Sequence, residues 1–298
     1  MNSTSLSNGT VRFNALLPGQ GYYSATRFTQ ALLLDGIAAH GHTYYPHFHE
    51  DGHDPLLHDS VPGPAEEFDL EPAPQTHDLA APGGAFLKIG VGVLRRGAEP
   101  YSPFRLFEIL DPGTWRVSPD SPRSLAIEHA AALPDGSYGY RLTYRVWLPE
   151  TGAVIHIDRT LENTGRNTLS TRHYNHNFIR IDDHPIGPDY SVELAFPVMS
   201  EKPLPPPAVI EGNAVRWTVP IRNAFFWSGF TGNATDNPAH NAFTLRHAGG
   251  CAVRYVTDAP LHEFRLFSTS HAMCPEPFTR LVVAPGSTVR WNSTITLK

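Results

Sequence analysis

The stretch from Thr171 to Asp183 carries the side chains best suited to chemistry in this sequence. Its composition and spacing predict a β-strand, and side chains on a strand alternate between two faces. One face then carries Tyr174, His176 and Phe178, an imidazole between two aromatic rings. An imidazole held on a rigid strand can act as a general acid or base. The alternative is a core histidine satisfied by a backbone carbonyl.

The opposite face of this strand carries His173, Asn175 and Asn177. A strand that only fills a core uses Val, Ile or Leu at such positions, because Asn disfavours strands and requires hydrogen-bond partners. The pattern predicts a polar floor suited to a hydroxylated ligand. Because Asn175 and Asn177 point away from His176, we expect them to fix the strand or a loop rather than to contact the same ligand.

Glu276 is the second candidate catalytic residue, since it lies between Pro275 and Pro277. A proline on each side fixes the local backbone and removes two amide donors. A carboxylate held so rigidly suits a base that must reach one proton. The alternative is an ordinary glutamate in a loop.

A histidine-rich segment between His40 and His58 also contains several acidic residues, which are the ligand types that metals prefer. His47 and His49 would share one strand face and could chelate an ion. The spacing matches no tight metal motif, so a histidine-rich binding loop is favoured. We expect no metal and no cofactor.

Two further sequence features have both a functional and a structural interpretation. Glu66 and Glu67 follow a rigid Pro62–Pro64 turn as paired carboxylates, with a solvated pair as the alternative. Gly90 and Gly92 do not make a dinucleotide-binding fingerprint, because the third glycine and the helix are missing. They are expected to allow close packing or to admit a ligand.

Composition bounds the function classes. The 298 residues are 41% hydrophobic and 17% charged with a net charge of −6, and no basic run indicates a nucleic-acid partner. No signal peptide or apolar run of membrane-spanning length is present, so a cytoplasmic protein without membrane contact is expected. Cys251 and Cys274 are the only cysteines and are expected to be reduced thiols in the core. No motif of a nucleophilic hydrolase occurs.

Short strand-like segments at regular spacing predict an all-β fold, a large antiparallel β-sandwich with few short helices. Residues 1–20 are expected to be a loose arm, and residues 21–298 a single catalytic domain. A hairpin is predicted between 138–148 and 153–161. A turn is predicted at Asp35–Gly36, and one strand over 86–94.

A family resemblance joins these features. Leu161-Glu-Asn-Thr-Gly-Arg-Asn-Thr-Leu169 followed by Tyr174-Asn-His-Asn-Phe178 resembles the aldose 1-epimerase (galactose mutarotase-like) superfamily. Cys274-Pro-Glu-Pro277 with Leu281–Val289 is similar to the end of that family. Leu32–Tyr45 resembles its opening hairpin, so the resemblance spans nearly the whole chain in order.

The resemblance implies a mutarotase acting on a sugar-like or carbonyl small molecule, with His176 as acid and Glu276 as base. It also implies a supersandwich fold and a substrate-contacting role for His58, with Arg27 as the sugar-facing arginine. Together with Glu66, Glu67, Tyr174 and Phe178, these two residues form the predicted substrate-binding set. The sequence has no match for the mid-chain Asp that orients sugar hydroxyls in the family. A monomer or homodimer is expected.

Two other functions remain open at this point. The same acid and base could serve a lyase, dehydratase or cyclising isomerase acting on a sugar-derived or other carbonyl metabolite. The histidine-rich segment and the missing Asp favour that alternative. A sandwich that binds carbohydrate without catalysis is the third possibility.

Overall fold

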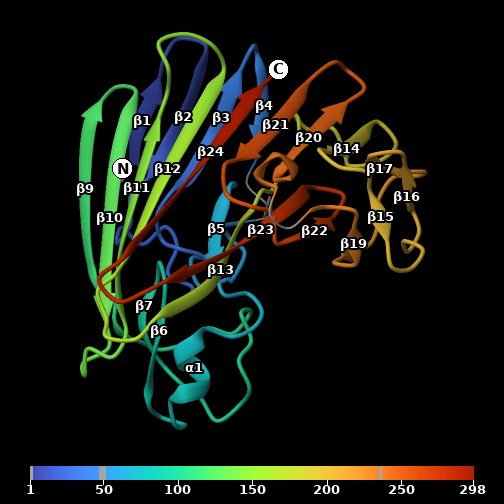
Figure 1. Cartoon of the computed structure of the whole chain (residues 1–298). Coiled ribbons are helices and arrows are strands. Elements are labelled where there is room, and N and C mark those ends of the chain that lie inside the picture. The colour runs from blue at the N-terminus through green and yellow to red at the C-terminus, as the bar shows by residue number, and fades with distance from the viewer. Residues whose placement is uncertain (1–2, 47–51, 235–236) are drawn as a thin grey trace.

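A ten-stranded antiparallel sheet forms one layer of the molecule (Figure 1). The computed structural model of the chain describes residues 3–46, 52–234 and 237–298. In spatial order the sheet contains β16 (Ala208–Glu211), β17 (Ala214–Trp217), β14 (Tyr190–Leu194), β20 (Ala242–His247), β21 (Ala252–Thr257), β24 (Thr288–Leu297), β12 (Val154–Asn163), β11 (Gly139–Trp147), β10 (Ser124–Ala132) and β9 (Thr114–Ser121). The predicted hairpin is confirmed, since β11 and β12 pair from Tyr140 opposite Asn163 to Trp147 opposite His156.

Two smaller sheets lie against this layer. The five-stranded sheet has the order β18 (Phe225–Trp227), β22 (Glu263–Ser268), β23 (Met273–Val283), β13 (Leu169–His176) and β5 (Ala65–Phe68). The four-stranded sheet contains β1 (Ser3–Ser7), β2 (Val11–Leu16), β3 (Leu33–Ala39) and β4 (His42–Tyr45). Phe13 from the four-stranded sheet, Phe68 from the five-stranded sheet and Trp291 from the ten-stranded sheet belong to one buried core. The prediction of an all-β antiparallel sandwich is therefore confirmed.

The remaining elements are short. They are β6 (Ala85–Lys88), β7 (Gly92–Arg95) and β8 (Ile109–Asp111) in a three-stranded sheet, the pair β15 (Met199–Ser200) and β19 (Phe230–Thr231), the helix α1 (Gln75–Leu79) and the 3-10 turn η1 (Pro238–His240). Across the described part of the chain, neither helical segment has the length or apolarity needed to cross a membrane.

The N-terminal segment was expected to be a loose arm, and that prediction is wrong. Residues 3–16 form the paired strands β1 and β2, and β2 pairs in turn with β3. Val11, Phe13 and Ala15 are buried while their neighbours Arg12 and Asn14 are exposed. This alternation is the signature of a half-buried strand.

One predicted turn and one predicted strand also need correction. The chain reverses at His40–Gly41, between β3 and β4, and Asp35–Gly36 instead lies inside β3, where the register with β2 shifts. The segment 86–94 is a hairpin of β6 and β7 rather than one strand. Gly90, with φ of 81°, packs so closely on Thr29 that a Cβ would lie 2.6 Å from the Thr29 Cβ. Glycine supplies the left-handed turn and the close packing there.

Cys251 and Cys274 are both free and buried, as the sequence predicted.

Candidate active site

The candidate site lies where the neighbouring strands β13 and β23 lose their backbone pairing (Figure 1). The two strands pair from Leu169 opposite Val283 to His173 opposite Thr279, and a single bridge between Ile179 and Met273 resumes the same register. That register, continued through the gap, sets His176 directly opposite Glu276. The two predicted catalytic residues are therefore cross-strand neighbours.

The sequence explains why the pairing stops there. Pro275 and Pro277 lie in β23 within the gap and have no amide hydrogen to donate to a neighbouring strand. The side chain of Asn177 replaces part of the missing ladder, because its Nδ2 donates to the carbonyl of Pro275 at 2.6 Å. Glu276 thus lies in a strand rather than a loop, and Asn177 fixes the strand, as predicted.

The strand carrying His176 is shorter than predicted, since β13 ends at that residue. Phe178 adopts φ of 43°, a left-handed conformation that is uncommon for a bulky side chain. Its ring nevertheless stays on the predicted face and stacks on the His176 imidazole, with centroids 4.1 Å apart. Phe28 and Phe267 approach the imidazole edge-on at 5.7 and 5.5 Å. Three aromatic rings therefore orient His176.

The acid and base candidates are in contact. Nε2 of His176 lies 3.2 Å from Oε1 of Glu276, and both side chains are almost fully buried. Burial raises the pKa of Glu276 to about 8, with the charge of Arg27 opposing and that of Glu67 adding to the shift. Burial, and then the charges of Arg27 and His58, lower the pKa of His176 well below its ordinary value. Opposed shifts in neighbouring groups are typical of acid–base sites.

Arg27 is held beside this pair by an ionic network. Its Nε donates to Oε2 of Glu67 at 2.9 Å, and its Nη2 donates to the Tyr174 hydroxyl at 3.3 Å. Tyr174 in turn donates to Glu67 at 2.5 Å. Lys88 completes the network, with Nζ 3.8 Å from Oε1 of Glu67. Glu67 and Tyr174 therefore position Arg27.

The pair opens into a pocket of about 450 Å³. Such a volume lies within the usual range for small-molecule sites. Arg27, His58, Phe178, His176 and Glu276 all line it, so the structure brings five of the eight predicted site residues into one cavity. Tyr174 and Glu67 lie just behind Arg27. His58 reaches the pocket from the loop before β5, with Nδ1 3.4 Å from Nη1 of Arg27.

Glu66 does not belong to this set, which corrects the prediction that it contacts substrate. It is adjacent to Glu67 on β5, so its side chain points to the opposite face of the sheet. There it is fully buried, 2.7 Å from Nε of Arg159 and 3.1 Å from Nε2 of His173. Asn175 joins the same cluster by accepting from Tyr255 at 3.0 Å. The polar groups of this cluster have hydrogen-bond partners within the protein, and the cluster lies away from the pocket.

Among the described histidines of the histidine-rich segment, His58 alone lines the pocket. His47 and His49 lie outside the described residues. His53 stacks on Tyr22, with ring centroids 4.1 Å apart. Within residues 3–46, 52–234 and 237–298, no three histidine, cysteine or acidic side chains cluster in an arrangement that could hold a metal ion.

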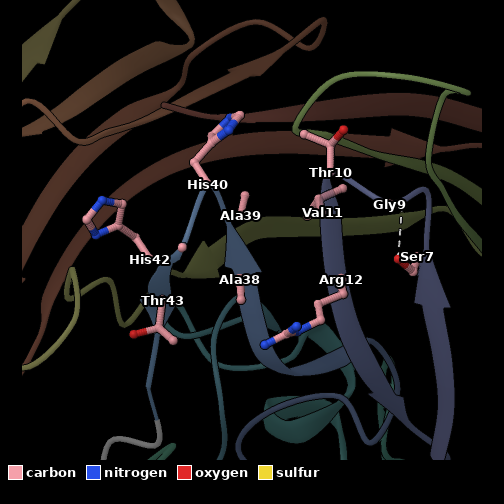
Figure 2. Close-up of a pocket in the computed structure, with 11 residues that line it drawn as sticks. Ser7, Gly9, Thr10, Val11, Arg12, Ala38, Ala39, His40, His42 and Thr43 are labelled. Atoms are coloured by element: carbon pink, nitrogen blue, oxygen red, sulfur yellow. Dashed lines mark hydrogen bonds between the residues drawn. The ribbon is translucent and has the colours of Figure 1, made fainter.

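A separate hollow of about 520 Å³ lies at one end of the four-stranded sheet (Figure 2). Its walls come from the ends of β1 to β4 and include Arg12, His40 and His42. His42 pairs with Asp182 at 2.8 Å. None of the predicted site residues lines this hollow. The candidate acid and base, His176 and Glu276, line the other pocket instead.

Several residues that line the candidate pocket were missed by sequence reasoning. Arg265 lies opposite Glu276 in the pairing of β22 with β23, a relation that needs the register. Phe104 comes from the loop before β8, and Phe226 comes from β18. The only sequence signal was an aromatic residue in the polar, proline-flanked stretch around Pro103.

Comparison with known proteins supports the fold. No protein-family model matches this sequence, and no curated protein matches it significantly. The structure of the Slr1438 protein from Synechocystis sp. PCC 6803 is similar over 99% of this chain and 95% of its own, with a TM-score of 0.61 at 11% identity.

Two further solved structures are similar to this chain over nearly its full length. The GalM/aldose epimerase homologue from C. elegans matches with a TM-score of 0.57 at 10% identity, over 99% of this chain and 98% of its own. The galactose mutarotase related enzyme from Lactobacillus acidophilus matches with a TM-score of 0.56 at 10% identity, over 99% and 97%. The chain therefore has the galactose mutarotase-like fold.

Proposed function

We propose that this protein interconverts the anomers of an aldose or a related cyclic hemiacetal. The observation that carries the proposal is the 3.2 Å contact between His176 and Glu276 at the floor of a pocket of about 450 Å³. A hemiacetal presents two neighbouring oxygens, the anomeric hydroxyl and the ring oxygen. An acid and a base mounted side by side on two strands can address both oxygens at once.

The proton balance of the reaction closes within this pair. Glu276 as carboxylate takes the proton of the anomeric hydroxyl while the bond between C1 and the ring oxygen breaks. His176 as imidazolium gives its proton to that oxygen, which leaves an open-chain aldehyde, a neutral imidazole and a protonated Glu276. After the aldehyde group rotates, His176 takes the proton back and Glu276 returns its own, which closes the ring as the other anomer.

The pKa shifts of Glu276 and His176 suit this transfer of protons. The pKa of Glu276 is raised to about 8 by burial and that of His176 is lowered by burial, so a protonated Glu276 beside a neutral imidazole is the favoured state. This is the protonation state that ring closure uses. Ring opening uses the alternative state with the same number of protons. The two groups titrate as a coupled pair that shares one mobile proton.

The other predicted residues take supporting roles in the proposal. Arg27 and His58 line the pocket and would contact the substrate, while Phe178 orients the His176 ring. Glu67 and Tyr174 hold Arg27 from behind. The lyase alternative has no support of its own in this site.

Anomer exchange measured by proton NMR on several aldoses tests the proposal. We expect wild type to accelerate exchange, and Glu276→Gln and His176→Asn each to reduce the rate by about 10²–10⁴-fold, the usual contribution of general acid–base catalysis. Sugar binding, measured by calorimetry, should survive both changes. Glu150→Gln on the exposed surface is the matched control.

Three results would contradict the proposal. An unaccelerated exchange with intact binding would indicate a carbohydrate-binding protein. A dehydrated product with new ultraviolet absorbance would indicate a lyase. Full activity in Glu276→Gln would remove Glu276 from the mechanism.

A further inference from the structure

The walls of the pocket carry apolar side chains, whereas its floor carries the ionisable pair His176 and Glu276. Six apolar residues line it: Leu70, Pro103, Phe104, Phe178, Phe226 and Phe267. Four of them are phenylalanines that come from four separate segments of the chain. A substrate seated on His176 and Glu276 would therefore meet aromatic side chains from several directions.

Two arginines that line the pocket spend much of their hydrogen-bonding capacity within the protein. The guanidinium of Arg27 makes one contact within the protein through each of its three nitrogens, to Glu67, Tyr174 and His58, which uses three of its five N–H donors. Arg265 donates through Nε and Nη2 to Glu263, at 2.7 and 3.2 Å, and lies 3.5 Å from Glu71 through Nη1. A polyhydroxylated ring needs several unused partners, because each buried hydroxyl without a hydrogen bond is costly.

Two of these phenylalanines are exposed to solvent. Phe104 is 57% exposed and Phe226 is 50% exposed, although both are large apolar side chains. Phe104 lies near the guanidinium of Arg27, which is 5.1 Å from its ring centroid, and its ring is 5.0 Å from that of His58. An apolar group bound between the rings of Phe104 and Phe226 would remove the faces of both rings from water. Such burial is favourable in proportion to the apolar area covered.

We infer that the substrate of this site is a cyclic hemiacetal with an apolar body, one whose hydroxyls beyond the anomeric centre are few or substituted. The inference rests on the proposed function and adds the substrate class. The anomeric hydroxyl and the ring oxygen meet the His176 and Glu276 pair. The apolar substituents lie between Phe104 and Phe226 at the mouth of the pocket.

Polarimetry on two probes that differ only in their other hydroxyls tests the inference. The probes are D-glucose and 2,3,4,6-tetra-O-methyl-D-glucose, which keeps the anomeric hydroxyl and carries methyl ethers elsewhere. We expect kcat/KM for the ether to exceed that for glucose by about tenfold or more, since even one methylene in an apolar pocket changes this ratio by roughly that factor.

The possible outcomes distinguish an error in the substrate class from an error in the proposed function. Acceleration of glucose with no acceleration of the ether would overturn the substrate class and leave the proposed function standing. No acceleration of either probe, where the hemiacetal chemistry is common to both, would overturn the proposed function and the inference with it.

Two variants locate the apolar subsite. Phe104→Ala and Phe226→Ala alter exposed side chains, so both should fold. We expect each to lower kcat/KM for the ether by about tenfold and that for glucose much less, because the lost contact is with a methyl ether. Val282→Ala, another exposed apolar residue that does not line the pocket, is the matched control and should change neither. Equal losses on both probes, or no loss on either, would overturn the assignment.

Discussion

Two fully buried glutamates on the same five-stranded sheet have opposite electrostatics. Burial alone would raise the pKa of both. At Glu66 the charges of Arg159 and His173 outweigh burial and hold the pKa at about 2. At Glu276 burial prevails and the pKa is about 8. The contrast shows that burial alone does not set the pKa of a buried carboxyl group. The positively charged and hydrogen-bonding partners around it decide whether the pKa falls or rises.

The surroundings of the two glutamates differ in the same way. Around Glu66, the indole of Trp291 donates to His173, His173 contacts Glu66, and Arg159 donates to Glu66 and Ser293. Every buried polar atom of this cluster has a partner. Around Glu276, Nδ1 of His176 has no hydrogen-bond partner among the described residues, and Oε1 of Glu67 has only the longer ionic contact with Lys88 at 3.8 Å. The satisfied cluster joins two sheets, and the unsatisfied one faces a pocket.

The largest effect should come from replacing each glutamate by glutamine in turn. Glu66→Gln leaves the Arg159 guanidinium buried without its counter-charge, so we expect a loss of about 3–5 kcal/mol in the free energy of unfolding. Glu276→Gln replaces a group that is neutral at pH 7 and should change that free energy by about 1 kcal/mol or less. Urea denaturation of both variants at pH 7 measures the difference. Equal destabilisation would erase the distinction between the two sites.

The stability of wild type relative to Glu276→Gln should also depend on pH. The folded pKa of Glu276 lies above its ordinary value of 4.5, so its contribution to stability is complete below about 4.5 and is lost as pH rises through about 8. Wild type should therefore lose stability relative to Glu276→Gln between pH 6 and pH 9. Denaturation curves at these two pH values provide the measurement, and a constant difference would show that Glu276 is not protonated at neutral pH.

The next effect concerns the pH dependence of anomer exchange. Above about pH 8 the coupled pair loses its mobile proton, so kcat/KM should fall about tenfold per pH unit on the alkaline side. On the acid side activity should persist below pH 6.5, because the pKa of His176 is lowered by burial. Stopped-flow polarimetry from pH 5 to pH 10 measures the profile. An alkaline limb that is absent in this range would remove Glu276 as the titrating group.

The smallest expected effect sharpens the assignment of that alkaline limb. The charge of Arg265 lowers the pKa of Glu276, so Arg265→Gln should move the limb to higher pH by a fraction of a pH unit. Arg246→Gln, which removes an exposed arginine paired with Glu193, is the control and should leave the limb in place. A shift to lower pH in Arg265→Gln would contradict the electrostatic account.

The sequence by itself determined the features that depend on local periodicity. Alternation along 171–178 separated Tyr174, His176 and Phe178 from the face with His173, Asn175 and Asn177, and the structure keeps the two groups apart. The two prolines around Glu276 predicted a constrained backbone, and the hydrogen-bond pairing between β13 and β23 is interrupted at these prolines. The β11 and β12 hairpin followed from two alternating runs and one turn.

Only the tertiary structure decided which residues those faces meet. Glu66 and Glu67 look equivalent in the sequence, but one faces Arg159 and the other faces Arg27, because β5 pairs beside β13 in one particular register. The same long-range register sets Arg265 beside Glu276 and brings Phe104 and Phe226 to the pocket mouth. A strand's alternation is a local property of the chain, whereas its neighbours are chosen by pairing and packing between distant segments.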